Sequence, residues 1–90
     1  MTQTLTIRAV DTADDLAGWV DHPDGPSLAY LQEAVGGLIE RVYLSPLFDG
    51  LVMWAHEEAL MMSDPVLNHA ASIMAGGSPI FGDVVLVREG

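Results

Sequence analysis

The sequence predicts an α+β fold: a small, mostly antiparallel four-stranded sheet packed with two or three helices. Short runs of alternating apolar residues are typical of strands, other runs have helical spacing, and Gly, Pro and Asp clusters separate them. No linker, repeat or low-complexity tract interrupts the 90 residues, so we expect one domain over residues 1–90. The expected order of elements is β-α-α-β-β-α-β.

The N-terminal part predicts a strand and then a helix. Apolar side chains alternate over Thr4–Val10, which indicates the strand. Thr12 is expected to cap the helix, because Asp15 three residues later can complete a capping box. The helix should end in the loop His22–Pro26, which holds two prolines and a glycine. Its apolar face would consist of Leu16, Trp19 and Val20.

The middle of the chain predicts a second helix and a hairpin. Ser27 is a suitable N-cap, and the pair Gly36-Gly37 is typical of a helix end. The helix between them has apolar residues at helical spacing, namely Leu28, Leu31 and Val35. The apolar runs Leu38–Leu44 and Leu51–Glu57 then predict an antiparallel pair of strands, since Asp49-Gly50 is a strong turn signal between them.

The C-terminal part predicts a third helix and a last strand. Asp64 offers a capping oxygen, and Pro65 suits the first helical position because the N–H that it lacks has no partner within the helix there. We expect the helix to run to about Ala75 and to end at Gly76-Gly77. Gly82-Asp83 then turns the chain into Val84–Val87, an unbroken apolar run that favours a central, buried strand.

The composition favours contact with another protein. Half of the residues are hydrophobic, and there is no cysteine to form a disulfide or a thiolate metal site. A chain of this length buries only about 60% of its unfolded surface on folding. We therefore expect part of the apolar surface to lie in an interface and predict a homo-oligomer.

The charge excludes several other partners. Thirteen acidic residues face three arginines, no lysine is present, and the net charge is −10. The negative electrostatic field of these charges repels nucleic-acid phosphate and anionic membranes, so direct nucleic-acid binding is disfavoured. The sequence also contains no run long enough to span a bilayer and no signal-peptide pattern at its start. A cytoplasmic location is the resulting expectation.

Local motifs give little support to catalysis. His56-Glu57-Glu58 is the most reactive-looking group, but Leu60 stands where a metalloprotease helix would need a second His. The serines lack a Gly-x-Ser-x-Gly context, and the glycine pairs lack the Lys of a phosphate-binding loop. We therefore expect no enzyme activity, no metal and no cofactor. His56, Glu57 and Glu58 remain candidates for binding a small ligand.

Two groups of residues are candidates for binding a partner. Trp54 with Met61 and Met62 offers aromatic and adaptable apolar contacts, although Trp54 fits the core equally well. The second group is an acidic stretch with no basic residue in it. A stretch of this kind is usually a solvated face, but it could also meet a basic groove or imitate phosphates. It contains Asp11, Asp14 and Asp15, followed by Asp21 and Asp24.

The segment Leu31-Gln32-x-x-Val35-Gly36-Gly37-x-Ile39-Glu40 resembles an uncharacterised domain family found mostly in bacteriophages, plasmids and their bacterial hosts. Further similarity lies in His56-Glu57-Glu58, where the family usually has Asn before Glu-Glu, in Pro65-x-x-Asn68-x-Ala70 and in Gly82–Val87. The resemblance implies a mobile-element origin and no established activity. It adds Gln32 and Asn68 to the ligand-binding candidates. Both also have structural interpretations, because their amides can bond to nearby backbone.

Three functions follow from these observations. The first is a phage-type accessory protein that binds a host or phage protein in the host cytoplasm and modulates a host factor. The second is an acidic nucleic-acid mimic that inhibits a DNA-binding protein of the host. The third is a small-ligand or metal-binding protein that uses His56, Glu57 and Glu58.

Overall fold

A computed structural model describes residues 1–9, 18–61 and 64–89. Its antiparallel sheet has the strand order β2-β1-β5-β4-β3. The strands are β1 (Thr2–Ile7), β2 (Val20–His22), β3 (Ile39–Val42), β4 (Leu51–His56) and β5 (Val84–Glu89). The helices are α1 (Leu28–Val35), α2 (His69–Met74) and the short 3-10 turns η2 (Pro46–Phe48) and η3 (Ala59–Met61). No helix in the described ranges has the length and apolar character needed to cross a membrane.

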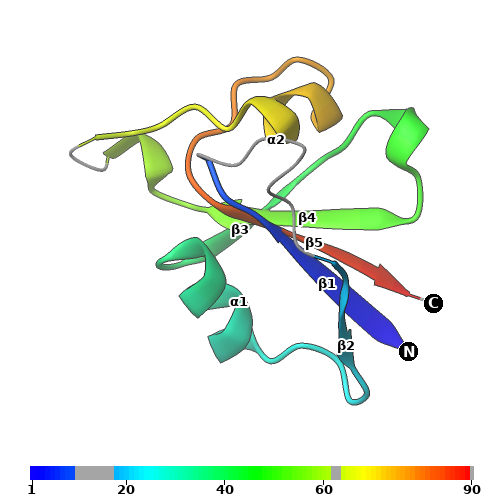
Figure 1. Cartoon of the computed structure of the whole chain (residues 1–90). Coiled ribbons are helices and arrows are strands. Elements are labelled where there is room, and N and C mark those ends of the chain that lie inside the picture. Colours follow the sequence, from blue (N-terminus) through cyan, green and yellow to red (C-terminus); the bar gives the residue numbers. More distant parts are fainter. Residues whose placement is uncertain (10–17, 62–63, 90) are drawn as a thin grey trace.

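The two α-helices lie on opposite faces of the sheet (Figure 1). Successive side chains of a strand point to opposite faces, so the central strand β5 supplies both cores. Val84 and Leu86 are buried in the core that includes Ala71 of α2, whereas Val85 is buried with Leu31 and Val35 of α1. The α+β class and the central, buried position of the last strand are therefore confirmed.

Helix α1 begins and ends where the sequence predicts. The hydroxyl of Ser27 accepts a hydrogen bond from the Tyr30 backbone N–H at 3.0 Å and caps the first turn. Gly36 has a φ of 88°, and its N–H donates to the Gln32 carbonyl. A side chain in this left-handed conformation is strained, which explains why glycine ends the helix here.

The hairpin is also confirmed. Strands β3 and β4 pair antiparallel, from Ile39 opposite His56 to Val42 opposite Met53. The connection contains η2 and ends at Gly50, which has a φ of 90°. Both strands are slightly shorter than the expected Leu38–Leu44 and Leu51–Glu57.

The four-stranded sheet was a wrong prediction, because a fifth strand follows the first. Val20, expected in the N-terminal helix, begins β2 and lies opposite Thr4 of β1. The spacing of Leu16, Trp19 and Val20 suggested one face of a helix, but the last two residues do not share a face. Trp19 packs against the α2-side core, whereas Val20 is 49% exposed on a sheet edge. The expected helix start at Thr12 lies outside the described residues.

The third helix begins later than predicted. Asp64-Pro65 does not start it; the N-cap is Asn68, whose side chain accepts a hydrogen bond from the Ala71 N–H at 3.1 Å. Leu67 instead forms an isolated antiparallel bridge with Phe81. This long-range pairing holds the chain extended up to Asn68, and it outweighs the local signal of a proline at the first helical position.

Candidate functional site

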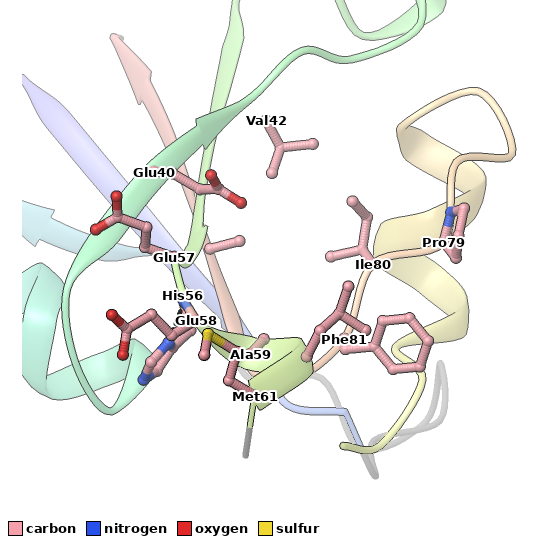
Figure 2. Close-up of a pocket in the computed structure, with 12 residues that line it drawn as sticks. Glu40, Val42, His56, Glu57, Glu58, Ala59, Met61, Pro79, Ile80 and Phe81 are labelled. Carbon is pink, nitrogen blue, oxygen red and sulfur yellow. Dashed lines mark hydrogen bonds between the residues drawn. The ribbon is translucent and has the colours of Figure 1, made fainter.

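An open cleft of about 290 Å³ lies at the β3 side of the sheet. Figure 2 shows Glu40, Glu57 and Glu58 on one side of it and Pro79, Ile80 and Phe81 on the other. The wall residues come from β3, the β4–η3 segment and the loop between α2 and β5. They are Glu40, Val42, Ala55, His56, Glu57, Glu58, Ala59, Leu60, Met61, Pro79, Ile80 and Phe81, and we call this the acidic cleft.

The register of the hairpin positions the β3 side of the cleft. Glu40 is paired with Ala55, and Val42 is paired with Met53. Paired residues project to the same face, and Met53 and Ala55 belong to the α2-side core. Glu40 and Val42 therefore face the α2 side of the sheet, where Val42 packs on the core and Glu40 is exposed.

Hydrogen bonds to α2 hold the opposite wall. The Ile80 carbonyl accepts from the Asn68 backbone N–H at 2.7 Å, and the Ile80 N–H donates to the Ser72 hydroxyl at 2.9 Å. Ile80 also packs against the α2-side core. This wall is consequently a fixed part of the fold, with partly buried Ile80 and Phe81 forming its apolar surface.

His56 forms part of the wall and has a defined structural role. Its Nδ1 accepts a hydrogen bond from the Glu58 backbone N–H at 2.9 Å. In the neutral ring the other nitrogen then carries the proton, so neither nitrogen has a free lone pair for a metal. The ring edge at Nε2 packs so closely on Gly37 that a methyl group there would require the ring to shift. His56 also lines a second cleft, beside the C-terminal end of α1.

The cleft has a one-sided charge. No Arg is among the described residues that line it, and the protein contains no Lys. Arg41 lies over the Tyr43 ring, with its guanidinium carbon 5.1 Å from the ring centre. Arg88 lies over Trp19 at 3.9 Å and donates to the Gln3 side chain at 2.8 Å. The cleft therefore favours cations over anions.

The structure brings together some of the predicted site residues. His56, Glu57, Glu58 and Met61 all line the acidic cleft, and Met61 is 83% exposed. Trp54 is not in it: it lies on the α1 side of the sheet and packs against the core of Leu31, Val35 and Val85. Among the remaining partner-binding candidates, Met62, Asp11, Asp14 and Asp15 lie outside the described residues. Asp21 and Asp24 are exposed and do not line the cleft, and Asp21 accepts a hydrogen bond from the Gln3 side chain at 2.6 Å.

Gln32 and Asn68 do not line the cleft either. Asn68 is 1% exposed, and its side-chain amide donates to the carbonyls of Ile7 at 3.0 Å and Gly82 at 2.9 Å. Asn68 therefore bridges two backbone carbonyls, as its structural interpretation from the sequence expects. The backbone carbonyl of Gln32 accepts from the N–H groups of Gly36 and Gly37, both at 2.9 Å. These bonds of Asn68 and Gln32 serve the fold.

Metal ligands do not converge in the described parts of the chain, where no three His, Asp or Glu side chains could hold an ion. The three histidines belong to different parts of the fold. The Nε2 atom of His22 is 2.8 Å from the Thr4 hydroxyl, and its ring packs edge-on against Tyr30. His69 is exposed at the start of α2.

Sequence reasoning missed Glu40, Val42, Ile80 and Phe81 as cleft residues. Ile80 and Phe81 follow α2 in a loop, where no local pattern marks them as partners of a hairpin. Glu40 did carry a signal, because it shares a strand face with the apolar Val42. A charge on the inward face of a strand is typical of a sheet edge.

The fold and the cleft together define a small α+β domain with an acidic, partly apolar depression beside one edge of an antiparallel sheet. Residues 17–90 match the profile of a domain of unknown function, DUF3846, and the chain belongs to this family. The matched region contains every residue of the acidic cleft and begins after β1. Neither the curated proteins nor the solved structures include a match to the chain.

Proposed function

We propose that this DUF3846 protein is a binding protein, and that the acidic cleft is its contact surface for a positively charged, partly apolar segment of another protein. The observation that carries the proposal is the composition of the cleft. Carboxylates form one wall, apolar side chains form the other, and no cation lines it among the described residues. A ligand with both a cationic and an apolar part is complementary to such walls.

The two walls would contribute differently to affinity. Glu57 and Glu58 are exposed, and exposed ion pairs contribute only about 0–1 kcal/mol each. Their main effect would be to attract cations at long range and to repel acidic segments. Burial of an apolar side chain against Ile80 and Phe81 would contribute more, up to about 1.5–3 kcal/mol for a Leu or Phe.

Exposed apolar residues at the mouth extend the contact surface. Leu60 is 69% exposed and Met61 is 83% exposed, both in η3. Unbranched Met side chains adapt to irregular surfaces, which suits a binding role. With the phage or plasmid origin that the sequence resemblance implies, the partner would be a host or phage protein in the host cytoplasm, and binding would modulate a host factor.

The charge and the state of His56 weigh against a small anionic ligand. A nucleotide would need cations to offset its phosphates, yet Arg41 and Arg88 are stacked on aromatic rings elsewhere. The Nδ1 lone pair of His56 is already used by Glu58. We therefore favour protein contact over small-ligand or metal binding.

Affinity capture from a bacterial lysate tests the proposal with three forms of the protein. The first is the wild type, and the second carries Glu40→Gln, Glu57→Gln and Glu58→Gln in the cleft. The third is a matched control with the same change in net charge at exposed acids outside the cleft: Asp24→Asn, Asp49→Asn and Glu89→Gln.

We expect one protein to be retained by the wild type and the control but lost by the cleft variant, and more weakly retained at high salt. Purified partner should then bind with the same ranking in a titration. Equal capture by all three forms would show that the contact lies elsewhere. Failure to capture any protein above background at low salt would also contradict the proposal.

A further inference from the structure

Strand β3 is an edge strand, and the acidic cleft lies directly beside it. In the order β2-β1-β5-β4-β3, only one side of β3 is paired within the described chain. Glu40 and Val42 of this strand are also walls of the cleft. A segment that added to the free side of β3 would therefore place every second side chain on the cleft face of the sheet.

The hydrogen-bond pattern shows which backbone groups are free. Glu57 donates its N–H to the carbonyl of Leu38 at 2.8 Å, and these residues are opposite each other in the extended register of the hairpin. In an antiparallel ladder, bonded and non-bonded positions alternate. The backbone groups of Glu40 and Val42 therefore face β4, whereas those of Ile39 and Arg41 face outward.

The position of the free groups matches a known way of binding an extended peptide. Outward-facing N–H and C=O groups on an edge strand pair with an added strand, and neighbouring pockets select its side chains. Here two residues offer backbone bonds, and Glu40 between them points to the cleft face. One four-residue strand thus offers both backbone groups that can bind a peptide and a side chain that can select among its residues.

We propose that the partner segment binds as an antiparallel strand added to β3, with alternating cationic side chains beside Glu40, Glu57 and Glu58. This inference rests on the proposed function, because it assigns the conformation and chemistry of the segment that the acidic cleft accepts. The segment should be positively charged, because the cleft has three carboxylates and the protein has a net charge of −10.

A second copy of this chain is a poor occupant of the same edge. Residues whose backbone groups face outward must lie opposite each other, which leaves two antiparallel registers of greatest overlap for two β3 strands. One places Glu40 opposite the Glu40 of the other copy, and the other places Arg41 opposite its Arg41. Like charges directly opposite each other destabilise a strand pair. Two chains that each carry a net charge of −10 also repel each other at long range. The observations thus favour a cationic partner.

The probe for a first test is a capped synthetic hexapeptide in which Lys alternates with Val, with Glu alternating with Val as the charge-reversed control. Binding is followed by fluorescence anisotropy of a labelled peptide and by amide hydrogen exchange of the protein. The Lys peptide should bind, and the amides of Ile39 and Arg41 should become more protected. Glu40 and Val42, whose amides already face β4, should change little.

Backbone methylation of the peptide separates strand addition from simple docking in the cleft. With Lys on the cleft face, the Val residues lie opposite Ile39 and Arg41, and their N–H groups face β3. Methylation of the Val amides should weaken binding about tenfold or more, because ladder hydrogen bonds are lost. Methylation of the Lys amides, which face away, should have little effect.

A matched pair of protein variants tests the same point. Arg41→Pro removes the outward N–H but no bond to β4, and proline is tolerated on an edge strand in this position. Arg41→Ala removes the same side chain and keeps the N–H. Both should fold, as judged by circular dichroism, but only Arg41→Pro should lose most of the peptide affinity.

Equal binding of the two methylated peptides would overturn strand addition, as would equal binding by Arg41→Pro and Arg41→Ala. Absence of any binding by the Lys peptide, or equal binding by the Glu peptide, would overturn it as well. None of these results removes the proposed function, which is decided by loss of the captured protein in the Glu40→Gln, Glu57→Gln, Glu58→Gln variant.

Discussion

The side-chain amide of Asn68 donates a hydrogen bond to the backbone carbonyl of Ile7 at 3.0 Å, across 61 positions of the sequence. The same amide donates to Gly82, and its oxygen accepts from Ala71. One buried side chain thus joins the end of β1, the start of α2 and the turn before β5. Because β1 and β5 pair at the centre of the sheet, this residue links the segments around the central strands.

Asn68→Ala should be strongly destabilising. The change leaves two carbonyls and one N–H without their partner, and each unpaired buried group costs about 1–3 kcal/mol. A total loss of about 3 kcal/mol would lower the Tm by more than about 10 °C in a domain of this size. Thermal and urea unfolding followed by circular dichroism would measure it.

Two further variants separate the donor role of Asn68 from general sensitivity at the helix start. Asn68→Asp has nearly the same shape and still accepts from Ala71, but an ionised carboxylate cannot donate to Ile7 or Gly82. It should be at least as destabilising as Asn68→Ala. His69→Ala, at an exposed neighbouring position, should change the free energy of unfolding by less than about 0.5 kcal/mol. A stable Asn68→Asp protein would contradict the bridging role.

Ser27→Ala should weaken α1 by removing its N-cap. The hydroxyl of Ser27 accepts from the Tyr30 N–H at 3.0 Å, and loss of such a cap costs about 1 kcal/mol. Ser27→Asn, which can cap equally well, should retain nearly all of the stability. Chemical unfolding of the three proteins gives the comparison, and equal losses in both variants would show that the hydroxyl has another role.

The contrast between α1 and α2 explains which parts of the fold the sequence predicts. α1 is defined by local signals, a serine cap and a glycine end, and was predicted at both ends. The start of α2 depends on the bridge between Leu67 and Phe81 and on the bonds from the Asn68 side-chain amide to Ile7 and Gly82, which join residues distant in the sequence. Strand β2 is likewise defined by its pairing with β1, and its three residues carry no alternation that would identify them.

The same distinction applies to the candidate site. His56, Glu57, Glu58 and Met61 are close in sequence and were recognised by their chemistry. Ile80 and Phe81 join them only because α2 returns the following loop to the β3 side of the sheet. Local sequence patterns do not indicate where a loop after a helix will lie in the fold. The apolar wall of the cleft was therefore not predictable from the sequence.

His56→Asn should preserve the turn after β4, whereas His56→Ala should not. The Nδ1 atom of His and the Oδ1 atom of Asn are the same number of bonds from the backbone, so both can accept from the Glu58 N–H. We expect His56→Ala to cost about 1 kcal/mol more than His56→Asn. Protection of the Glu58 amide in hydrogen-exchange measurements reports the bond directly, and equal exchange in the two variants would contradict this role.

The close packing of His56 on Gly37 predicts an energetic coupling between the two positions. A methyl group at Gly37 would meet the His56 ring, so Gly37→Ala should cost about 1–3 kcal/mol. Asn at position 56 lacks the Nε2 edge of the ring, which makes the closest contact, so the double variant Gly37→Ala, His56→Asn should recover most of this loss.

Gly36→Ala is the matched control for that coupling. Its cost arises from a φ of 88°, and a methyl group there meets no atom within 4 Å. His56→Asn should therefore not rescue Gly36→Ala, whereas its coupling to Gly37→Ala should be about 1–2 kcal/mol in a double-mutant cycle. Additive effects at Gly37 would show that the ring moves aside at little cost, and that His56 is not fixed between α1 and the cleft.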